Sequence, residues 1–140
     1  MASLVFFDSN VLVYADDLSS GAKLTIARNL LEQHVGDGTA VVSLQVLQEY
    51  YAAATRKLGI AADQAQERVR VMAEGLVVCF EAKDVMEAID LHRLRQISFW
   101  DALIVHAARS AGAAVLYSED VQHGAVLGGV RIENPFAVHD

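Results

Sequence analysis

Short apolar runs alternate with longer amphipathic segments along this chain. The apolar runs predict strands over Leu4–Phe7, Ala40–Ser43, Leu76–Phe80, Ala113–Tyr117 and Val130–Ile132. Compact apolar runs of this kind are typical of strands buried on both faces of a parallel sheet. The intervening segments have helical spacing and predict helices from Asn10 and over Lys23–Val35, Leu44–Leu58, Ala61–Glu74, Lys83–Arg95 and Phe99–Ala111. This alternation favours an α/β fold.

Glycine positions predict where several of these elements end. Four glycines are expected to stop helices at their C-terminal ends: Gly36, Gly59, Gly75 and Gly112. Gly36-Asp37-Gly38 and Gly128-Gly129 have the composition of tight turns rather than of domain boundaries. With 140 residues, of which 54% are hydrophobic, the chain has the size and apolar content of one domain, which we assign to residues 1–140.

The chain is acidic, with a formal net charge of −7 and a pI near 5.1. This charge argues against a protein that holds nucleic acid through bulk positive charge. The single cysteine, Cys79, lies in an apolar run without a disulfide partner or metal-ligand spacing, so we expect a core thiol and a reducing, cytoplasmic environment. The N-terminus lacks the basic stretch of a signal peptide, and no apolar segment approaches membrane-spanning length.

Four acidic residues lie at or just after points where a strand-like run gives way to a turn or a helix: Asp8, Glu49, Asp101 and Asp120. In a sheet flanked by helices such points tend to lie along one edge, so these carboxylates can converge in one crevice. A divalent metal would balance their charge and supply the positive charge that the surface lacks. Without metal, mutual repulsion should couple the titrations and keep at least one proton bound at a higher pH than usual.

Each acid also has a simpler explanation. Asp8 has the position of an N-cap for the next helix. Glu49 borders the apolar face of its helix, where a solvated glutamate is equally expected. Asp101 lies in an apolar segment that predicts a central helix, where burial of an isolated carboxylate is costly. The Ser98-x-x-Asp101 spacing is also that of a capping box, and both interpretations can hold because a helix N-terminus favours negative charge.

The fourth acid lies within Ser118-Glu119-Asp120, directly after the fourth predicted strand. Glu119 and Asp120 compete for the inward position, Ser118 is a candidate hydroxyl ligand, and a helix cap is the simpler explanation. His106 lies five residues past Asp101, and a satisfied structural histidine explains it better than a supporting role in the site.

Taken together, the segments that carry these residues resemble PIN-domain ribonucleases, especially the VapC-type toxins of bacterial toxin–antitoxin pairs. The segments are Phe7-Asp8-Ser9-Asn10-Val11-Leu12, Gln48-Glu49-Tyr50, Ser98-Phe99-Trp100-Asp101-Ala102-Leu103-Ile104 and Leu116-Tyr117-Ser118-Glu119-Asp120-Val121-Gln122-His123-Gly124. They occur in order over nearly the whole chain. The resemblance implies a three-layer α/β/α sandwich whose central, mainly parallel sheet has four to five strands.

The resemblance also implies roles for residues at matching positions. One or two Mg²⁺ or Mn²⁺ ions would be held mainly by Asp8 and Asp101, and Glu49 and Asp120 would complete the site directly or through water. Three further polar residues would support the site: Asn10, Ser118 and Glu119. Among these, Glu119 can share the role of Asp120 or replace it.

The implied activity is cleavage of single-stranded or loop RNA. Carboxylate oxygens suit hard cations, and Mg²⁺ keeps several of its waters, so one bound water can attack the phosphorus. Because water attacks rather than the 2′-hydroxyl of the RNA, we predict products with 5′-phosphate and 3′-hydroxyl ends.

Binding partners follow partly from the residues and partly from the resemblance. Four cationic residues near the predicted crevice are candidate RNA contacts, although solvated helix ends explain them equally well: Arg56, Lys57, Arg93 and Arg95. Trp100, Tyr50 and Tyr51 are also able to stack on bases, but their apolar neighbours predict core positions first. The resemblance implies a cytoplasmic homodimer that is inhibited by a small antitoxin, whose C-terminal segment covers the acidic site and often inserts an arginine.

Other classes of protein fit the sequence less well. A phosphatase of the haloacid-dehalogenase type needs D-x-D after its first strand, where this chain has Asp8-Ser9-Asn10. A receiver domain needs paired acids before its phosphorylated aspartate and a late lysine. The remaining alternative is a PIN-like module that binds RNA or protein without cutting, and the intact set of acids argues against it.

Overall fold

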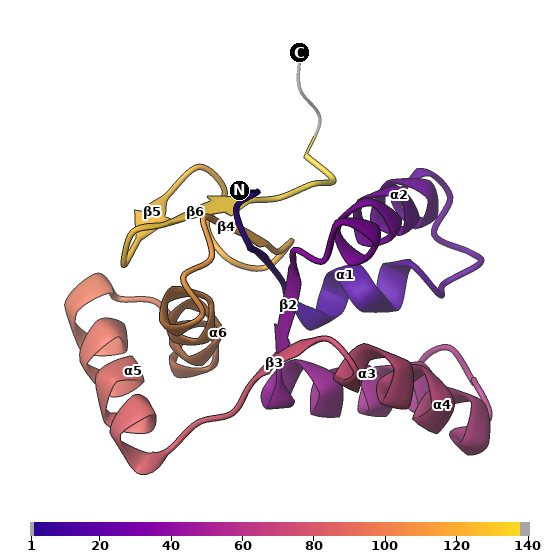
Figure 1. Cartoon of the computed structure of the whole chain (residues 1–140), viewed down its shortest axis with the longest axis horizontal. Coiled ribbons are helices and arrows are strands. Elements are labelled where there is room, and N and C mark those ends of the chain that lie inside the picture. Colours follow the sequence, from indigo (N-terminus) through magenta and orange to yellow (C-terminus); the bar gives the residue numbers. More distant parts are fainter. Residues whose placement is uncertain (1, 138–140) are drawn as a thin grey trace.

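The computed structural model describes residues 2–137, which form a mainly parallel sheet flanked by helices (Figure 1). The strand order is β3-β2-β1-β4-β6-β5, and only the β5–β6 pair is antiparallel. The strands are β1 Val5–Phe7, β2 Ala40–Ser43, β3 Leu76–Val78, β4 Val115–Tyr117, β5 Val126–Leu127 and β6 Val130–Glu133. The predicted α/β architecture is confirmed.

Six helices are seen within this range: α1 Ser9–Tyr14, α2 Ala22–Asp37, α3 Leu44–Arg56, α4 Ala62–Ala73, α5 Ala82–Arg95 and α6 Phe99–Ser110. Figure 1 shows α5 and α6 on one side of β1 and β2, and α1 and α2 on the other. Helix α6 packs directly on the sheet, and its residues 102–108 are all buried, as expected for a central helix.

The sheet has six strands within residues 2–137, rather than four to five. Sequence reasoning missed β5, because a strand of two residues gives no periodic signal. The turn predicted at Gly128-Gly129 is confirmed and joins β5 to β6. Both glycines have positive φ, 58° and 81°, as a two-residue hairpin turn of this type requires.

The glycines predicted to end helices agree with the observed helix ends to different degrees. Gly112, with φ of 74°, follows the last residues of α6 as expected. Gly36 instead lies inside α2, which ends at Asp37, and Gly38 is the left-handed cap with φ of 72°. The tight turn predicted at Gly36-Asp37-Gly38 is therefore wrong for its first two residues. Gly75 follows the end of α4 at the same distance as Gly112 follows α6, as expected, whereas Gly59 lies three residues past Arg56, the last residue of α3.

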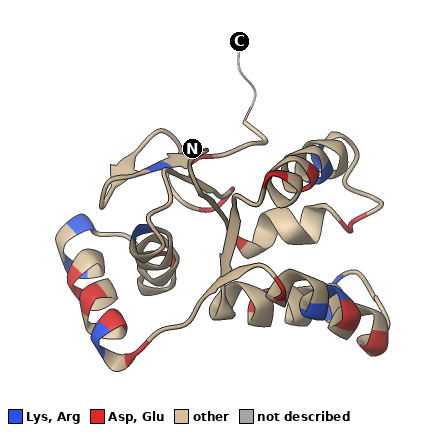
Figure 2. Ribbon diagram, in the orientation of Figure 1, with Lys and Arg blue, Asp and Glu red and all other residues tan. Residues whose placement is uncertain are grey.

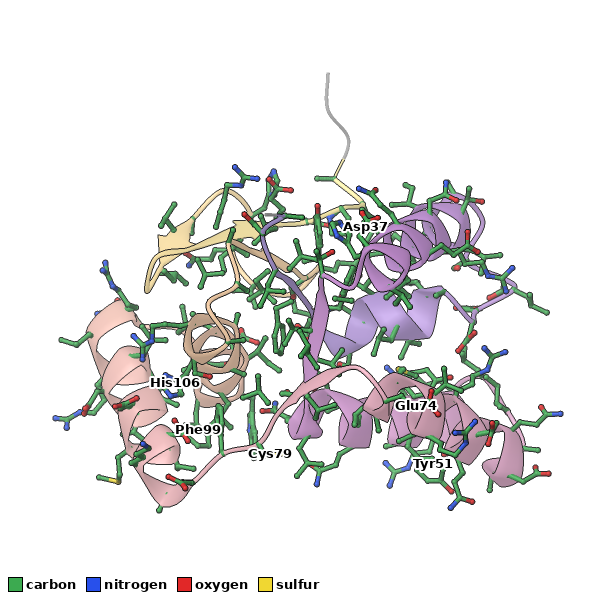
Figure 3. The ribbon with its side chains drawn as sticks, in the orientation of Figure 1. Asp37, Tyr51, Glu74, Cys79, Phe99 and His106 are labelled. Carbon is green, nitrogen blue, oxygen red and sulfur yellow. The ribbon has the colours of Figure 1, made fainter. Side chains whose placement is uncertain are left out.

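Three residues expected in the core lie at the surface. Cys79 is exposed, because the edge strand β3 ends at Val78 and the thiol lies on the connection to α5 (Figure 3). Trp100 is 63% exposed in the first turn of α6, and Tyr51 is also exposed. Of the three aromatic residues expected in the core, Tyr50 alone is fully buried as predicted.

Across the described residues, none of the helices combines the length and apolarity needed to span a membrane.

Candidate functional site

The site is built where β1 and β4 end side by side. Parallel pairing places Phe7 opposite Tyr117, so the next residues, Asp8 and Ser118, are also neighbours. The Ser118 hydroxyl donates to Asp8 Oδ2 at 2.7 Å, and the Asp8 main-chain N–H donates to the Tyr117 carbonyl at 3.0 Å. Two residues 110 positions apart in the sequence are thereby fixed at the carboxyl edge of the sheet.

Asp8 is a buried carboxylate, with 5% of its surface exposed. Asp8 is also the N-cap of α1, and its Oδ1 accepts from the Ser9 main-chain N–H at 2.7 Å. The prediction that Asp8 caps this helix is therefore confirmed. Burial raises the pKa of Asp8 to about 6, the hydrogen bonds from Ser118 and Ser9 oppose this rise, and the charges of Glu49 and Asp120 add to it. The pKa of Asp8 is therefore raised, as expected, but burial contributes more to the rise than the repulsion between the acids does.

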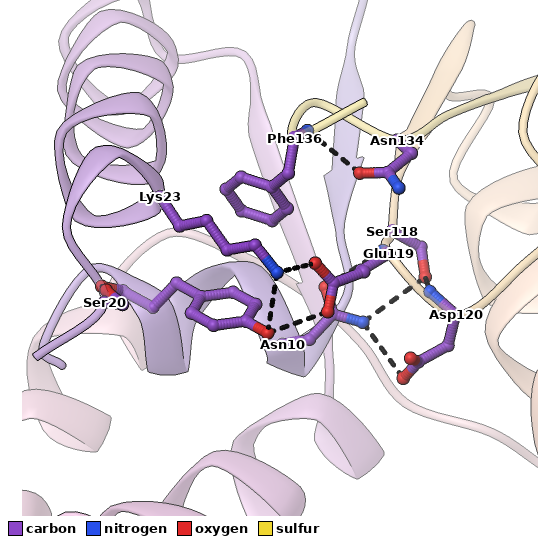
Figure 4. Close-up of polar contacts among 9 residues, drawn as sticks. Asn10, Ser20, Lys23, Ser118, Glu119, Asp120, Asn134 and Phe136 are labelled. Atoms are coloured by element: carbon purple, nitrogen blue, oxygen red, sulfur yellow. Dashed lines mark hydrogen bonds and ion pairs between the residues drawn. The ribbon is translucent and has the colours of Figure 1, made fainter. Parts of the chain in front are cut away.

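Asn10 connects Asp120 to this pair. Its Nδ2 donates to Asp120 Oδ2 at 3.2 Å and lies 3.5 Å from the Ser118 hydroxyl, while its Oδ1 accepts from the Glu119 main-chain N–H at 3.2 Å (Figure 4). The Ser118 oxygen also accepts from the Asp120 main-chain N–H at 3.1 Å. Two side chains, Asn10 and Ser118, therefore link the carboxylates of Asp8 and Asp120.

Glu49 and Asp101 reach the site from α3 and α6. Glu49 is exposed, and its Oε1 accepts from the Ser9 hydroxyl at 3.1 Å. Asp101 lies in the first turn of α6, where its main-chain N–H donates to the Ser98 hydroxyl at 3.0 Å, so Ser98 is the predicted cap. Burial raises the pKa of Asp101, Ser98 opposes the rise, and the charge of Asp120 adds to it. The Asp101 carboxylate therefore lies within range of the negative charge of Asp120.

Glu119 is held apart from these acids. Its Oε1 accepts from the Tyr14 hydroxyl at 2.7 Å, and its Oε2 pairs with the Lys23 ammonium at 2.6 Å (Figure 4). The structure therefore places the carboxylate of Asp120, rather than that of Glu119, against the Asn10 amide nitrogen.

A cleft of about 780 Å³ is lined by one of the four predicted acids, Asp120, and not by Asp8, Glu49 or Asp101. Its lining also includes Asn10, and Lys57 at the end of α3. Of the other cationic candidates, Arg95 lines a separate hollow beside Gly128, and Arg56 and Arg93 are exposed. Figure 2 shows acidic and basic segments interspersed along α4 and α5 rather than gathered by sign. The structure brings only Lys57 of these four into the cleft wall.

A second polar cluster, Asp84, Glu87 and His106, was not anticipated. It is the one group of three potential ligands within residues 2–137 whose ligand atoms all lie within 4.8 Å of one another, so the four predicted acids are more widely spaced. The i,i+3 spacing of Asp84 and Glu87 was the available signal, but nothing local in the sequence pairs that helix with His106.

The His106 ring lies between α5 and α6 (Figure 3) and has partners on both nitrogens. Arg109 Nη2 lies 2.7 Å from Nδ1, and Asp84 Oδ1 and Glu87 Oε2 lie 3.0 and 3.2 Å from Nε2. A guanidinium only donates, so Nδ1 accepts and the ring proton is on Nε2. That nitrogen has no free lone pair for a metal. The prediction of a satisfied structural histidine is confirmed.

The chemistry of the four predicted acids fits a hard divalent cation better than does the His106 cluster. The donors around Asp8 are all oxygens, which Mg²⁺ and Mn²⁺ prefer. The Asp8 carboxylate is buried and faces the like charges of Glu49 and Asp120, so a cation beside it would offset an unfavourable potential.

The fold and this site define an α/β protein with an acidic site at the carboxyl edge of its sheet. The family model of the PIN domain matches residues 5–126, and the chain belongs to the PIN domain family. None of the curated proteins matches the chain.

Several solved structures share the fold. A toxin–antitoxin complex from Klebsiella pneumoniae has a TM-score of 0.70 at 19% identity, covering 96% of this chain and 99% of its own. VapBC2 from Rickettsia felis, bound to a promoter DNA fragment, has a TM-score of 0.65 at 21% identity, with coverages of 93% and 97%. VapC20 from Mycobacterium tuberculosis, described as a sarcin–ricin loop cleaving toxin, has a TM-score of 0.63 at 21% identity, with coverages of 83% and 89%.

Proposed function

We propose that this protein is a metal-dependent endoribonuclease and the toxin of a VapC-type toxin–antitoxin pair. One observation carries the proposal: the Asp8 and Asp120 carboxylates are linked through Ser118 and Asn10 at the edge of a PIN-domain sheet, beside an open cleft. The fold shared with toxins of toxin–antitoxin complexes supports the choice of substrate and partner.

The residues of the site would have two kinds of role, metal binding and orientation of the metal ligands. Asp8 and Asp101 would be the main ligands of one or two Mg²⁺ or Mn²⁺ ions, and Glu49 and Asp120 would complete the set directly or through water. Ser118 and Asn10 orient the carboxylates to which they are bonded. A bound divalent ion would lower the pKa of a coordinated water and offset the negative charge of the scissile phosphate.

RNA would be held in the cleft between α1, the end of α3 and the loop after β4. Lys57 supplies a cation on its wall, and Asn10 and the Ser9 hydroxyl add hydrogen-bonding groups. Since the chain is acidic, few phosphates would be contacted, and the salt dependence of binding would be moderate. Arg56, Arg93 and Arg95 would contribute only through a longer RNA.

An antitoxin would cover the acidic site and an adjoining apolar surface. Two neighbouring hollows between α2 and α4 share five apolar lining residues: Leu12, Leu31, Val35, Val71 and Met72. Val35 and Val71 are more than half exposed, as expected of a surface that a partner covers. We further propose a cytoplasmic homodimer, whose cytoplasmic location follows from the RNA substrate.

Cleavage of end-labelled total transfer and ribosomal RNA tests this function. Wild type, Asp8→Asn and the control Glu87→Gln would each be incubated with Mg²⁺, Mn²⁺ or chelator. We expect discrete metal-dependent cuts by wild type and Glu87→Gln, and a rate at least about 100-fold lower for Asp8→Asn, because a misplaced or missing ligand weakens both metal binding and orientation.

The chemistry of the product ends adds a second criterion. Attack by water predicts 5′-phosphate and 3′-hydroxyl ends, which polynucleotide kinase and ligase treatment distinguish from 2′,3′-cyclic phosphate. Cyclic ends would contradict the mechanism. Metal-loaded wild type that binds RNA but leaves it intact would instead support the non-cutting PIN-like module.

A further inference from the structure

Three residues from three elements form a compact cluster next to the proposed metal site. The Tyr14 hydroxyl of α1 donates to Glu119 Oε1, and the Lys23 ammonium of α2 pairs with Glu119 Oε2 (Figure 4). The Lys23 Nζ atom also lies 3.3 Å from the Tyr14 oxygen and 4.7 Å from the centre of the Tyr14 ring. Phe136 packs edge-on against Tyr14 and covers the cluster.

This cluster fixes the loop after β4 against α1 by two independent contacts. Asn10 and Tyr14 are one helical turn apart on α1, so both can face the same loop. Tyr14 holds the Glu119 side chain, and Asn10 accepts the Glu119 main-chain N–H at 3.2 Å. Lys23 connects the same carboxylate to α2.

The main-chain contact determines which way the Asn10 amide faces. Only its Oδ1 can accept from the Glu119 N–H, so the amide nitrogen must face Asp120, to which it donates at 3.2 Å. A displacement of Glu119 would release the amide to rotate, and Asp120 would lose the donor that orients its carboxylate.

Lys23 also controls the charge beside the site. Glu119 is adjacent to Asp120 in the chain, and without a cation it would add a further negative charge to a crowded acidic edge. The hydrogen bonds from Lys23 and Tyr14 instead hold this carboxylate in a paired position.

We propose that Tyr14, Lys23 and Glu119 are positioning residues for the metal site: they clamp the loop after β4 onto α1 and so fix the Asn10 amide and the Asp120 carboxylate in their metal-binding orientation. The inference rests on the proposed function, because the clamp would orient residues of the same four-acid metal site. It also explains why the Glu119 carboxylate, predicted as an alternative to that of Asp120, is paired with Tyr14 and Lys23 instead of facing the other acids.

Calorimetric titration with MnCl₂ tests the clamp without requiring cleavage. The variants are Tyr14→Phe, which removes one hydroxyl, and Lys23→Met, which removes the charge but keeps most of the side-chain length. Lys23→Arg is the conservative rescue. Lys83→Met is the matched control, because its ammonium lies 3.8 Å from an exposed carboxylate, Glu81, at the start of α5.

We expect Tyr14→Phe and Lys23→Met to raise the Kd for Mn²⁺ about 10-fold, a typical loss when an outer hydrogen-bond partner of a metal ligand is removed. Lys23→Arg should restore most of the affinity, and Lys83→Met should match wild type. In cleavage, kcat should fall while KM for RNA stays the same, since the clamp acts on the metal site rather than on RNA.

A double-mutant cycle distinguishes a clamp that orients Asp120 from contacts that only stabilise the fold. If the clamp acts through Asp120, Tyr14→Phe should have no further effect on the Kd in an Asp120→Asn background. An equal loss in both backgrounds, or a lower Tm with unchanged Mn²⁺ affinity, would overturn the inference while leaving the proposed function intact. Absence of Mn²⁺ binding by wild type would overturn both.

Discussion

The two carboxylate clusters of this protein differ in what balances their charge. Asp84, Glu87 and His106 lie closer together, but Arg109 holds one nitrogen of the imidazole and the carboxylates accept from the other side. Around Asp8 the partners are a hydroxyl and a main-chain N–H, and the neighbouring charges of Glu49 and Asp120 have the same sign. The charges of the His106 cluster are therefore balanced without a metal ion, whereas a cation beside Asp8 would offset the repulsion between carboxylates.

This difference shows that closeness of potential ligand atoms is a poor guide to a metal site. The pKa shifts give the more useful contrast. The pKa of Asp84 is lowered, first by the hydrogen bond from the Glu81 main-chain N–H and then by His106, whereas burial raises the pKa of Asp8 to about 6. A site that lacks compensation before its cation binds should be the one with raised pKa values.

The largest expected effect is a pH dependence of stability with opposite sign at the two clusters. The folded-state pKa of Asp8 lies above its unfolded value of 3.8, so the folded protein binds more protons between pH 4 and pH 6. Its contribution to stability therefore falls as pH rises through that window, by about 3 kcal/mol for about two pKa units. The lowered pKa of Asp84 gives a contribution that is present above the unfolded pKa and lost as pH falls through the folded pKa.

Urea unfolding in chelator at about pH 2.5, pH 4 and pH 7 measures both signs. From pH 4 to pH 7 Asp8→Asn should gain stability relative to wild type. From about pH 2.5 to pH 4 Asp84→Asn should lose stability relative to wild type, because the lowered pKa of Asp84 places its contribution in that range. If the stability of both variants, relative to wild type, changed in the same direction with pH, the pKa values of Asp8 and Asp84 would not be shifted in opposite directions.

The second effect is stabilisation by Mn²⁺. At a concentration one hundred times the Kd, linkage adds about 2.7 kcal/mol to the free energy of unfolding. Thermal unfolding at pH 7 should show a higher Tm with Mn²⁺ for wild type and Glu87→Gln, and little change for Asp8→Asn and Asp101→Asn. If Glu87→Gln alone abolished the shift, the ion would bind at the His106 cluster instead.

A smaller effect is expected from Arg109→Ala. His106 is 3% exposed, and loss of the guanidinium leaves its Nδ1 without this donor, at a cost of roughly 2 kcal/mol. The free energy of unfolding should fall accordingly, while the Mn²⁺-induced change in Tm stays at the wild-type value. A matching loss of Mn²⁺ response would show that the two clusters are energetically connected.

The sequence predicted the fold well because hydrophobic runs are local signals. Strands β1, β2 and β4 and the central position of α6 follow from such runs, whereas the two residues of β5 are too short to give one. Trp100 was misjudged for a related reason. Its neighbours are apolar, but only the packed structure shows that the first turn of α6 leaves it exposed.

The site was predictable in its residue types but not in its connections. The contact of Asp8 with Ser118 depends on the parallel pairing of β1 with β4, which brings together residues 110 positions apart. The choice between Asp120 and Glu119 depends on Lys23, which lies 96 positions before Glu119. Local sequence carries neither piece of information.

Location of the ion by anomalous diffraction would show directly which of the two carboxylate clusters binds metal. Crystals of the metal-free protein would be soaked in MnCl₂ near neutral pH and measured close to the manganese absorption edge. We predict an anomalous peak in contact with oxygens of Asp8 and Asp101. A peak on His106 Nε2 between Asp84 and Glu87, with none beside Asp8, would contradict it.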